Sequence, residues 1–191
     1  MRKVYPAAAA LGVLALLPWL VTQAIFTDSA DVGSNTFTTG TVDISTSPAS
    51  ALVTYSNMAP GDSTTASLTV TNGGTLGLRY AISSSATNPD GKGLKDQLVL
   101  TIKTVDVTTP AAPCDNFDGT QLYSGDVDST DGKLVGDAAQ GAQAGDRTLA
   151  AGASEVLCFR VALPVTTGNA YQSASTTVTS TFSAEQTANN P

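Results

Sequence analysis

Histidine is absent from this sequence of 191 residues. Its absence excludes the Ser-His and Cys-His nucleophile arrangements, the HExxH zinc motif and every metal site built on imidazole. The sequence also lacks a GxSxG elbow, a P-loop and a dinucleotide-binding fingerprint. Its two glutamates, Glu155 and Glu185, lie far apart in the sequence and fit surface positions better than a glycosidase pair. The sequence therefore predicts a protein that is not an enzyme.

Positive charge is also scarce. Nine Lys and Arg residues stand against sixteen Asp and Glu residues, which gives a net charge of −7. Such a chain has no cluster of basic side chains to displace counterions from phosphate, so nucleic acid is excluded as a partner. Nearly all of the acidic residues are aspartates, which are typical of turns and metal-binding loops rather than of helices.

The N-terminus has the pattern of a leader. Arg2 and Lys3 precede an apolar stretch at 7–17, and Thr22-Gln23-Ala24 places small residues where a signal peptidase requires them. We therefore predict a signal peptide over 1–24, cleavage between Ala24 and Ile25, and a secreted domain over 25–191 with no stable membrane span. An uncleaved membrane anchor is the alternative, because the longer apolar stretch at 7–25 is about long enough to span a bilayer.

Cysteine occurs twice, as Cys114 and Cys158. An even pair in an exported chain indicates a disulfide, whereas two separate buried thiols are the alternative. Because Leu157 and Phe159 flank Cys158 in an alternating run, we expect Cys158 to point away from the main apolar face.

The rest of the chain favours strands, because apolar residues alternate with polar ones and no long run of helical periodicity occurs. Turn signals rich in Gly, Pro, Asn and Asp separate these runs. We predict an all-β fold, an antiparallel β-sandwich that is jelly-roll-like or immunoglobulin-like, in one domain. The expected strands lie near residues 42–44, 66–70, 78–82, 98–102, 157–163 and 178–182.

A long acidic, glycine-rich stretch at 108–148 is predicted to be a loop-rich insertion. Weak strand signals at 122–123 and 134–135 suggest at most a short hairpin within it. Three aspartates of this stretch, Asp126, Asp128 and Asp131, precede a glycine, with Asp115 and Asp118 upstream. Clustered carboxylates on a sharp turn suit calcium, but the spacing departs from the EF-hand loop, and a solvated acidic loop is the alternative.

Three segments resemble the TasA/camelysin family of bacterial proteins, whose leaders are cut by a SipW-type signal peptidase. The first combines Phe26-Thr27-Asp28 with the sequence NTFTTGTVDI at 35–44. The middle one is MAPGD at 58–62, followed by VTNGGTL at 70–76 and Tyr80. The last comprises Leu163-Pro164, TGNAYQ at 167–172 and FSAEQT at 182–187.

The resemblance implies a jelly-roll subunit that is secreted to the bacterial cell surface or the biofilm matrix. It implies that the protein polymerises with itself into filaments by strand donation, with a SipW-type peptidase as its processing partner. The donor would lie within 25–35, with Ile25, Phe26 and Val32 as apolar anchors. An incoming strand satisfies the backbone groups of an open sheet edge. A frayed N-terminus on a monomer is the alternative.

Two other functions stay open. One is a monomeric, calcium-assisted module that binds a surface or a carbohydrate, for which Tyr55, Tyr123 and Tyr171 offer stacking rings. The other is a metalloendopeptidase, an activity with which some family members are credited. Because the sequence offers no histidine for a zinc site, we do not transfer that activity and expect no cofactor other than calcium.

Overall fold

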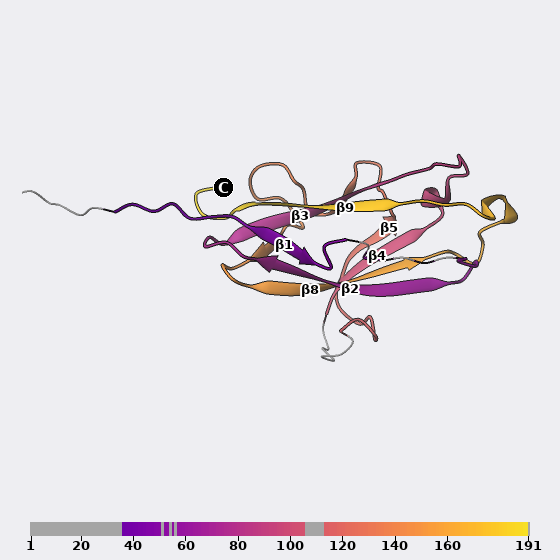
Figure 1. Ribbon diagram of the computed structural model, residues 1–191, viewed down its shortest axis with the longest axis horizontal. Coiled ribbons are helices and arrows are strands. Elements are labelled where there is room, and N and C mark those ends of the chain that lie inside the picture. The colour runs from indigo at the N-terminus through magenta and orange to yellow at the C-terminus, as the bar shows by residue number, and fades with distance from the viewer. Residues whose placement is uncertain (1–35, 51, 54, 56, 106–112, 191) are drawn as a thin grey trace, which may run out of the picture. The chain divides into compact units, whose positions relative to one another are not determined.

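The computed structural model describes residues 36–50, 52, 53, 55, 57–105 and 113–190 (Figure 1). The chain divides into two units, Met1–Thr38 and Thr39–Pro191, and the fold below is that of the second. The predicted leader at 1–24, its cleavage point between Ala24 and Ile25, and the anchors Ile25, Phe26 and Val32 lie outside the described residues. Within the described ranges, no helix has the length and the apolar composition needed to cross a membrane.

One sheet has five strands, all paired antiparallel. Their order across the sheet places the longest two, β2 and β8, next to each other near its middle. In that order the strands are β1 (Ile44–Ser47), β2 (Ser63–Asn72), β8 (Ser154–Ala162), β4 (Val99–Thr104) and β5 (Gln121–Asp126).

The second sheet is built around β3 (Leu78–Ala86). Along one edge β3 pairs with β9 (Val178–Gln186) over nine residues. Two short strands, β6 (Lys133–Val135) and β7 (Arg147–Leu149), pair with different parts of β3. Single 3₁₀ turns, η1 (Leu94–Asp96) and η2 (Asn169–Tyr171), lie in the connections.

The two sheets pack face to face because alternate residues of each strand point inward. Leu68 and Val70 of β2 share one buried cluster with Leu78 and Ile82 of β3. The all-β antiparallel sandwich predicted from the sequence is confirmed.

A polar contact joins the sheets through this core. The hydroxyl of Tyr80, on β3, donates to Glu155, on β8, at 2.6 Å, and Arg147 of β7 forms an ion pair with the same carboxylate. Burial, followed by the hydrogen bond to Glu155, raises the pKa of Tyr80 well above its usual value. The buried hydroxyl therefore stays protonated and satisfied, which a core position requires.

The stretch at 108–148 is more regular than predicted. Within its described part, β5 and β6 are complete strands and β7 begins, and each pairs with a strand of the main sheets. The weak signals at 122–123 and 134–135 therefore mark strands of the sandwich itself. Strands this short, with polar residues at exposed positions, offer too few alternations to be recognised.

The strand orders show which edges of the two sheets lie on the same side of the sandwich. β5 lies at one edge of the five-stranded sheet and contacts β6 of the other sheet. The opposite edges, β1 and β9, therefore lie on the other side (Figure 1).

Candidate functional site

The N-terminal part of the unit is hydrogen-bonded to the turn between β2 and β3, where residues 39–43 lie against residues 72–76. We call these two paired segments the ladder. The backbone N–H groups of Thr75 and Leu76 donate to the Thr41 carbonyl at 3.1 and 3.2 Å, and that of Gly73 donates to the Asp43 carbonyl at 2.9 Å. The Thr41 N–H in turn donates to the Thr75 hydroxyl at 2.9 Å. The first and middle segments of the family resemblance are therefore in direct contact.

Two glycines allow this close approach. A Cβ on Gly74 would overlap the Thr41 carbonyl oxygen, and a Cβ on Gly40 would lie 2.5 Å from the Leu76 side chain. At Gly74 the missing Cβ lets two backbone segments come this near, whereas at Gly40 it leaves room for the Leu76 side chain. The glycines of both segments thus have a shared structural purpose that a turn signal alone does not reveal.

Asn72 fixes the turn beneath the ladder. Its fully buried side-chain amide donates to the carbonyls of Leu76, Leu149 and Ala150, at 2.8, 3.2 and 3.0 Å. Its side-chain oxygen accepts from the Gly74 N–H at 2.9 Å. One side chain thereby ties the β2–β3 turn to the β7–β8 turn.

β9 has one free edge among the described residues. Hydrogen bonds from Thr187 to Gly77 and from Thr87 to Thr177 show that the odd-numbered residues of β9 bond to β3. The N–H and C=O groups of the even-numbered residues therefore point away from β3. Within the described ranges, no hydrogen bond reaches these outward groups at Val178, Ser180, Phe182 or Ala184.

The inner face of β9 is covered at one end and open at the other. Phe182 and Ala184 pack against the core, with the Phe182 ring 6.1 Å from that of Tyr80. Val178 and Ser180 have side chains on the same face but are exposed. The first half of β9 therefore presents both an unpaired edge and an uncovered inner face.

The residues after β9 bond to its C-terminal end, near Gln186. The Asn190 side-chain amide donates to the Gln186 carbonyl at 3.2 Å, and the Arg79 guanidinium donates to the Asn190 carbonyl. Arg79 also forms an ion pair with Glu185. We call residues 187–190 the clasp.

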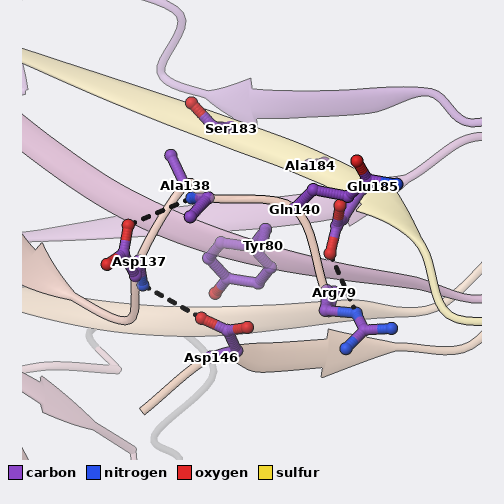
Figure 2. A pocket seen from close by; sticks show the side chains of 10 residues that line it. Arg79, Tyr80, Asp137, Ala138, Gln140, Asp146, Ser183, Ala184 and Glu185 are labelled. Carbon is purple, nitrogen blue, oxygen red and sulfur yellow. Dashed lines mark hydrogen bonds and ion pairs between the residues drawn. The ribbon is translucent and has the colours of Figure 1, made fainter. Parts of the chain in front are cut away.

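Figure 2 shows a pocket of about 170 Å³ on the outer face of β3 and β9, beneath the connection from β6 to β7. Its carboxylates already have partners. Asp146 accepts from the backbone N–H groups of Asp137 and Gln143, and Glu185 accepts from that of Gly141 at 2.9 Å. Lys133 and the Ala139 N–H lower the pKa of Asp137. These contacts hold the loop between β6 and β7 against the sheet.

The predicted calcium ligands do not converge. Among the described residues, no group of three or more Cys, Asp or Glu side chains is placed to hold a metal ion. Asp128 pairs with Lys95 at 3.0 Å, whereas Asp126 and Asp131 are exposed. Asp96 and Asp128 together raise the pKa of Lys95. Upstream, Asp115 is exposed and Asp118 accepts a hydrogen bond from Asn116.

Cys114 and Cys158 form a disulfide with an S–S distance of 1.99 Å. The two cysteines and Phe117 make a small buried cluster separate from the main core, to which Leu157 and Phe159 belong. The guanidinium of Arg160 lies 3.8 Å from the centre of the Phe117 ring, and Lys103 lies over the same ring at 4.9 Å. The sequence did not predict this cation–aromatic cluster. Its one indication in the sequence is Phe117, an isolated aromatic residue soon after Cys114.

Together these features define a class of protein: a disulfide-linked antiparallel sandwich whose residues 39–43 are hydrogen-bonded to the β2–β3 turn and whose strand β9 has an outer edge that is unpaired among the described residues. The chain belongs to the family described as camelysin metallo-endopeptidase, whose family model matches residues 4–190. This confirms the resemblance found in the sequence. None of the curated proteins with which the sequence was compared matches it.

The family description implies a catalytic metal, which the donor groups of this chain do not fit. The sequence has no histidine, and both cysteines are joined to each other. Glu155 and Glu185 are engaged by Arg147 and Arg79. We therefore derive no catalytic step through a metal.

Proposed function

We propose that this protein is an exported structural subunit that assembles with copies of itself into filaments at a bacterial cell surface or in a biofilm matrix. The segment at 25–35 of one copy would pair with the free edge of β9 of another. The observation that carries this proposal is the free edge of β9, where the outward backbone groups from Val178 to Ala184 have no partner among the described residues. A long exposed edge readily accepts a further strand, and soluble monomers usually protect such edges.

The open half of β9 also suits an apolar partner. Val178 is exposed on the face that points toward the other sheet. An added strand would pair with the edge while its alternate side chains, among them Ile25, Phe26 and Val32, covered this face.

The clasp covers one end of the β9 edge, because the Asn190 side-chain amide donates to the Gln186 carbonyl there. The free part of the edge, from Val178 to Ala184, lies toward the other end of the strand. In the proposed assembly, the donor of a second copy would pair with this free part.

The first test compares the chain 25–191 with the chain 35–191 by negative-stain electron microscopy and sedimentation. We expect filaments from the longer chain and compact monomers from the shorter one, since the shorter chain lacks the donor. Filaments from both chains would show that the N-terminal segment is not the donor strand. Monomers from both would contradict self-assembly.

A second test alters the acceptor edge. Ser180→Pro removes an N–H group that points away from β3 at an exposed position, whereas Ser180→Ala keeps that group. We expect the proline variant to lose filaments and the alanine variant to retain them. Thermal unfolding of both monomers should agree within a few degrees, which separates lost assembly from lost folding. Normal filaments from Ser180→Pro would show that another edge accepts the donor.

The proposal also predicts that the protein is not a peptidase. The purified chain should not cleave casein, and adding zinc or a chelator should change nothing, because the described residues supply no convergent metal ligands. Casein cleavage that a chelator abolishes and zinc restores would establish an enzyme and overturn this part of the proposal.

A further inference from the structure

The clasp ends the free edge of β9 at a defined residue. The outward backbone groups recur at every second residue of the strand, so the next ones after Ala184 belong to Gln186. The Gln186 carbonyl accepts from the Asn190 side-chain amide at 3.2 Å. A side-chain N–H group thus occupies the position that a backbone N–H group of an added strand would need. Within the described ranges, the free edge therefore runs from Val178 to Ala184.

The clasp is held to the sheet at both of its ends. The Thr187 N–H donates to the Gly77 carbonyl at 3.0 Å, which continues the pairing with β3 by one residue. Beyond β9 the yellow end of the chain turns back (Figure 1), and Asn189 has a φ of 56° there. Asparagine adopts this left-handed conformation more readily than most residues. The buried Arg79 guanidinium then donates to the Asn190 carbonyl. The clasp is therefore part of the fold.

The sequence of β9 does little to fix the register of an added strand. From Val178 to Ala184 it reads VTSTFSA, in which most residues are Ser or Thr. Register is strongly specified only where a clear alternation of apolar and polar side chains buries one face. Because the outward groups recur at every second residue, a strand that slipped by two residues would still pair with the edge. A fixed stop at one end removes such alternatives.

We propose that the clasp sets the register of the strand that adds to β9, and that the Asn190 side-chain amide is the register-determining group. This inference rests on the proposed function, in which the added strand is the segment 25–35 of a second copy. The clasp stops the donor beside Ala184, so that its side chains meet the exposed Val178 and Ser180 in a single alignment. Without the clasp the edge extends to Gln186, and a second alignment, shifted by two residues, becomes available.

Two substitutions in the clasp test this inference. Asn190→Ala removes the side-chain amide but keeps the backbone carbonyl to which Arg79 donates. Asn189→Gly removes the same kind of side chain from the exposed neighbouring position, and glycine suits the left-handed backbone there. Asn189→Gly is therefore the matched control. Thermal unfolding of both variants should agree with that of the unaltered chain within a few degrees.

The experiment reads the register by disulfide trapping in filaments of the chain 25–191. Chains carrying Ser180→Cys are assembled with chains that carry one cysteine at each of positions 26–34 in turn, then oxidised and separated on non-reducing denaturing gels. Directly opposite residues have Cβ atoms about 4.5–5.5 Å apart, whereas diagonal neighbours are about 7–8 Å apart. A disulfide needs a Cβ–Cβ distance of about 3.5–4.5 Å, so the directly opposite position should be trapped with by far the highest yield.

We expect trapped dimers at one donor position for the unaltered clasp and for Asn189→Gly. When Asn190→Ala is added to the Ser180→Cys chain, a second position two residues away should also give dimers. A single unchanged position in Asn190→Ala, or dimers at several positions with the clasp unaltered, would overturn the register role and leave strand donation intact. Filaments that give no dimer at any position would contradict β9 as the acceptor, and with it both the proposed function and this inference.

Discussion

Replacing Cys114 and Cys158 with alanine is expected to lower the free energy of unfolding by about 4 kcal/mol. The disulfide joins residues 44 positions apart, and closing a loop of that length restricts the unfolded chain by about this amount. In a domain of this size the loss corresponds to a fall in Tm of roughly 10 °C. Urea denaturation and thermal unfolding under non-reducing conditions would measure it.

The reduced native chain provides the matched comparison. A reductant should bring its Tm close to that of the double-alanine variant and should leave the variant itself unchanged. If the variant lost less than about 1 kcal/mol, the packing of Phe117 beneath Arg160 and Lys103, and not the covalent bond, would be holding this segment to the sheet.

Asn72→Leu is expected to cost about 3 kcal/mol or more, although leucine is similar in size and more apolar. The substitution removes a fully buried amide whose two N–H groups are shared among the carbonyls of Leu76, Leu149 and Ala150, and whose oxygen accepts from Gly74. The Ala150 carbonyl keeps the N–H of Ala153 at 3.0 Å, so the loss falls on the carbonyls of Leu76 and Leu149 and on the Gly74 N–H. Burying such groups without partners carries a larger penalty than an extra apolar contact can offset.

Asn72→Asp sharpens the test, because it preserves the acceptor for the Gly74 N–H but turns a carboxylate toward carbonyl oxygens. It should be as destabilising as Asn72→Leu at neutral pH. Asn169→Ala, at an exposed position at the start of η2, serves as the control and should change stability by less than about 0.5 kcal/mol. Equal and small losses in all three variants would show that the two turns hold together without Asn72.

The sequence predicted the sandwich wherever strands were long and alternated clearly. Leu68 and Val70, and Leu78, Tyr80 and Ile82, face one core as their spacing indicates. The strand β7 was not predicted, and β6 gave only the weak signal at 134–135, because three residues cannot establish a period and the position of both strands depends on pairing with β3. The predicted first strand also begins later, at Ile44, because the residues before it bond to a turn as the ladder.

The candidate site was less accessible to sequence reasoning because its contacts join distant positions. The segment around Asn72 reads as an ordinary turn, yet its side chain bonds to carbonyls 77 and 78 positions away. Asp128 reads as a possible calcium ligand, but Lys95, 33 positions away, neutralises it. A local pattern specifies which groups are present, whereas the fold decides which of them meet.

The pairing of β9 with β3 over nine residues has a mechanical consequence. In the proposed filament, tension would enter one subunit through the donor beside β9 and leave it through the ladder, at the end of β2. Both paths run along the strands. A pull in that direction loads the hydrogen bonds between neighbouring strands in shear, so that many must break together, whereas a pull across the sheet would open them one at a time. The strand layout would therefore give a thin fibre high tensile strength from contacts that are individually weak.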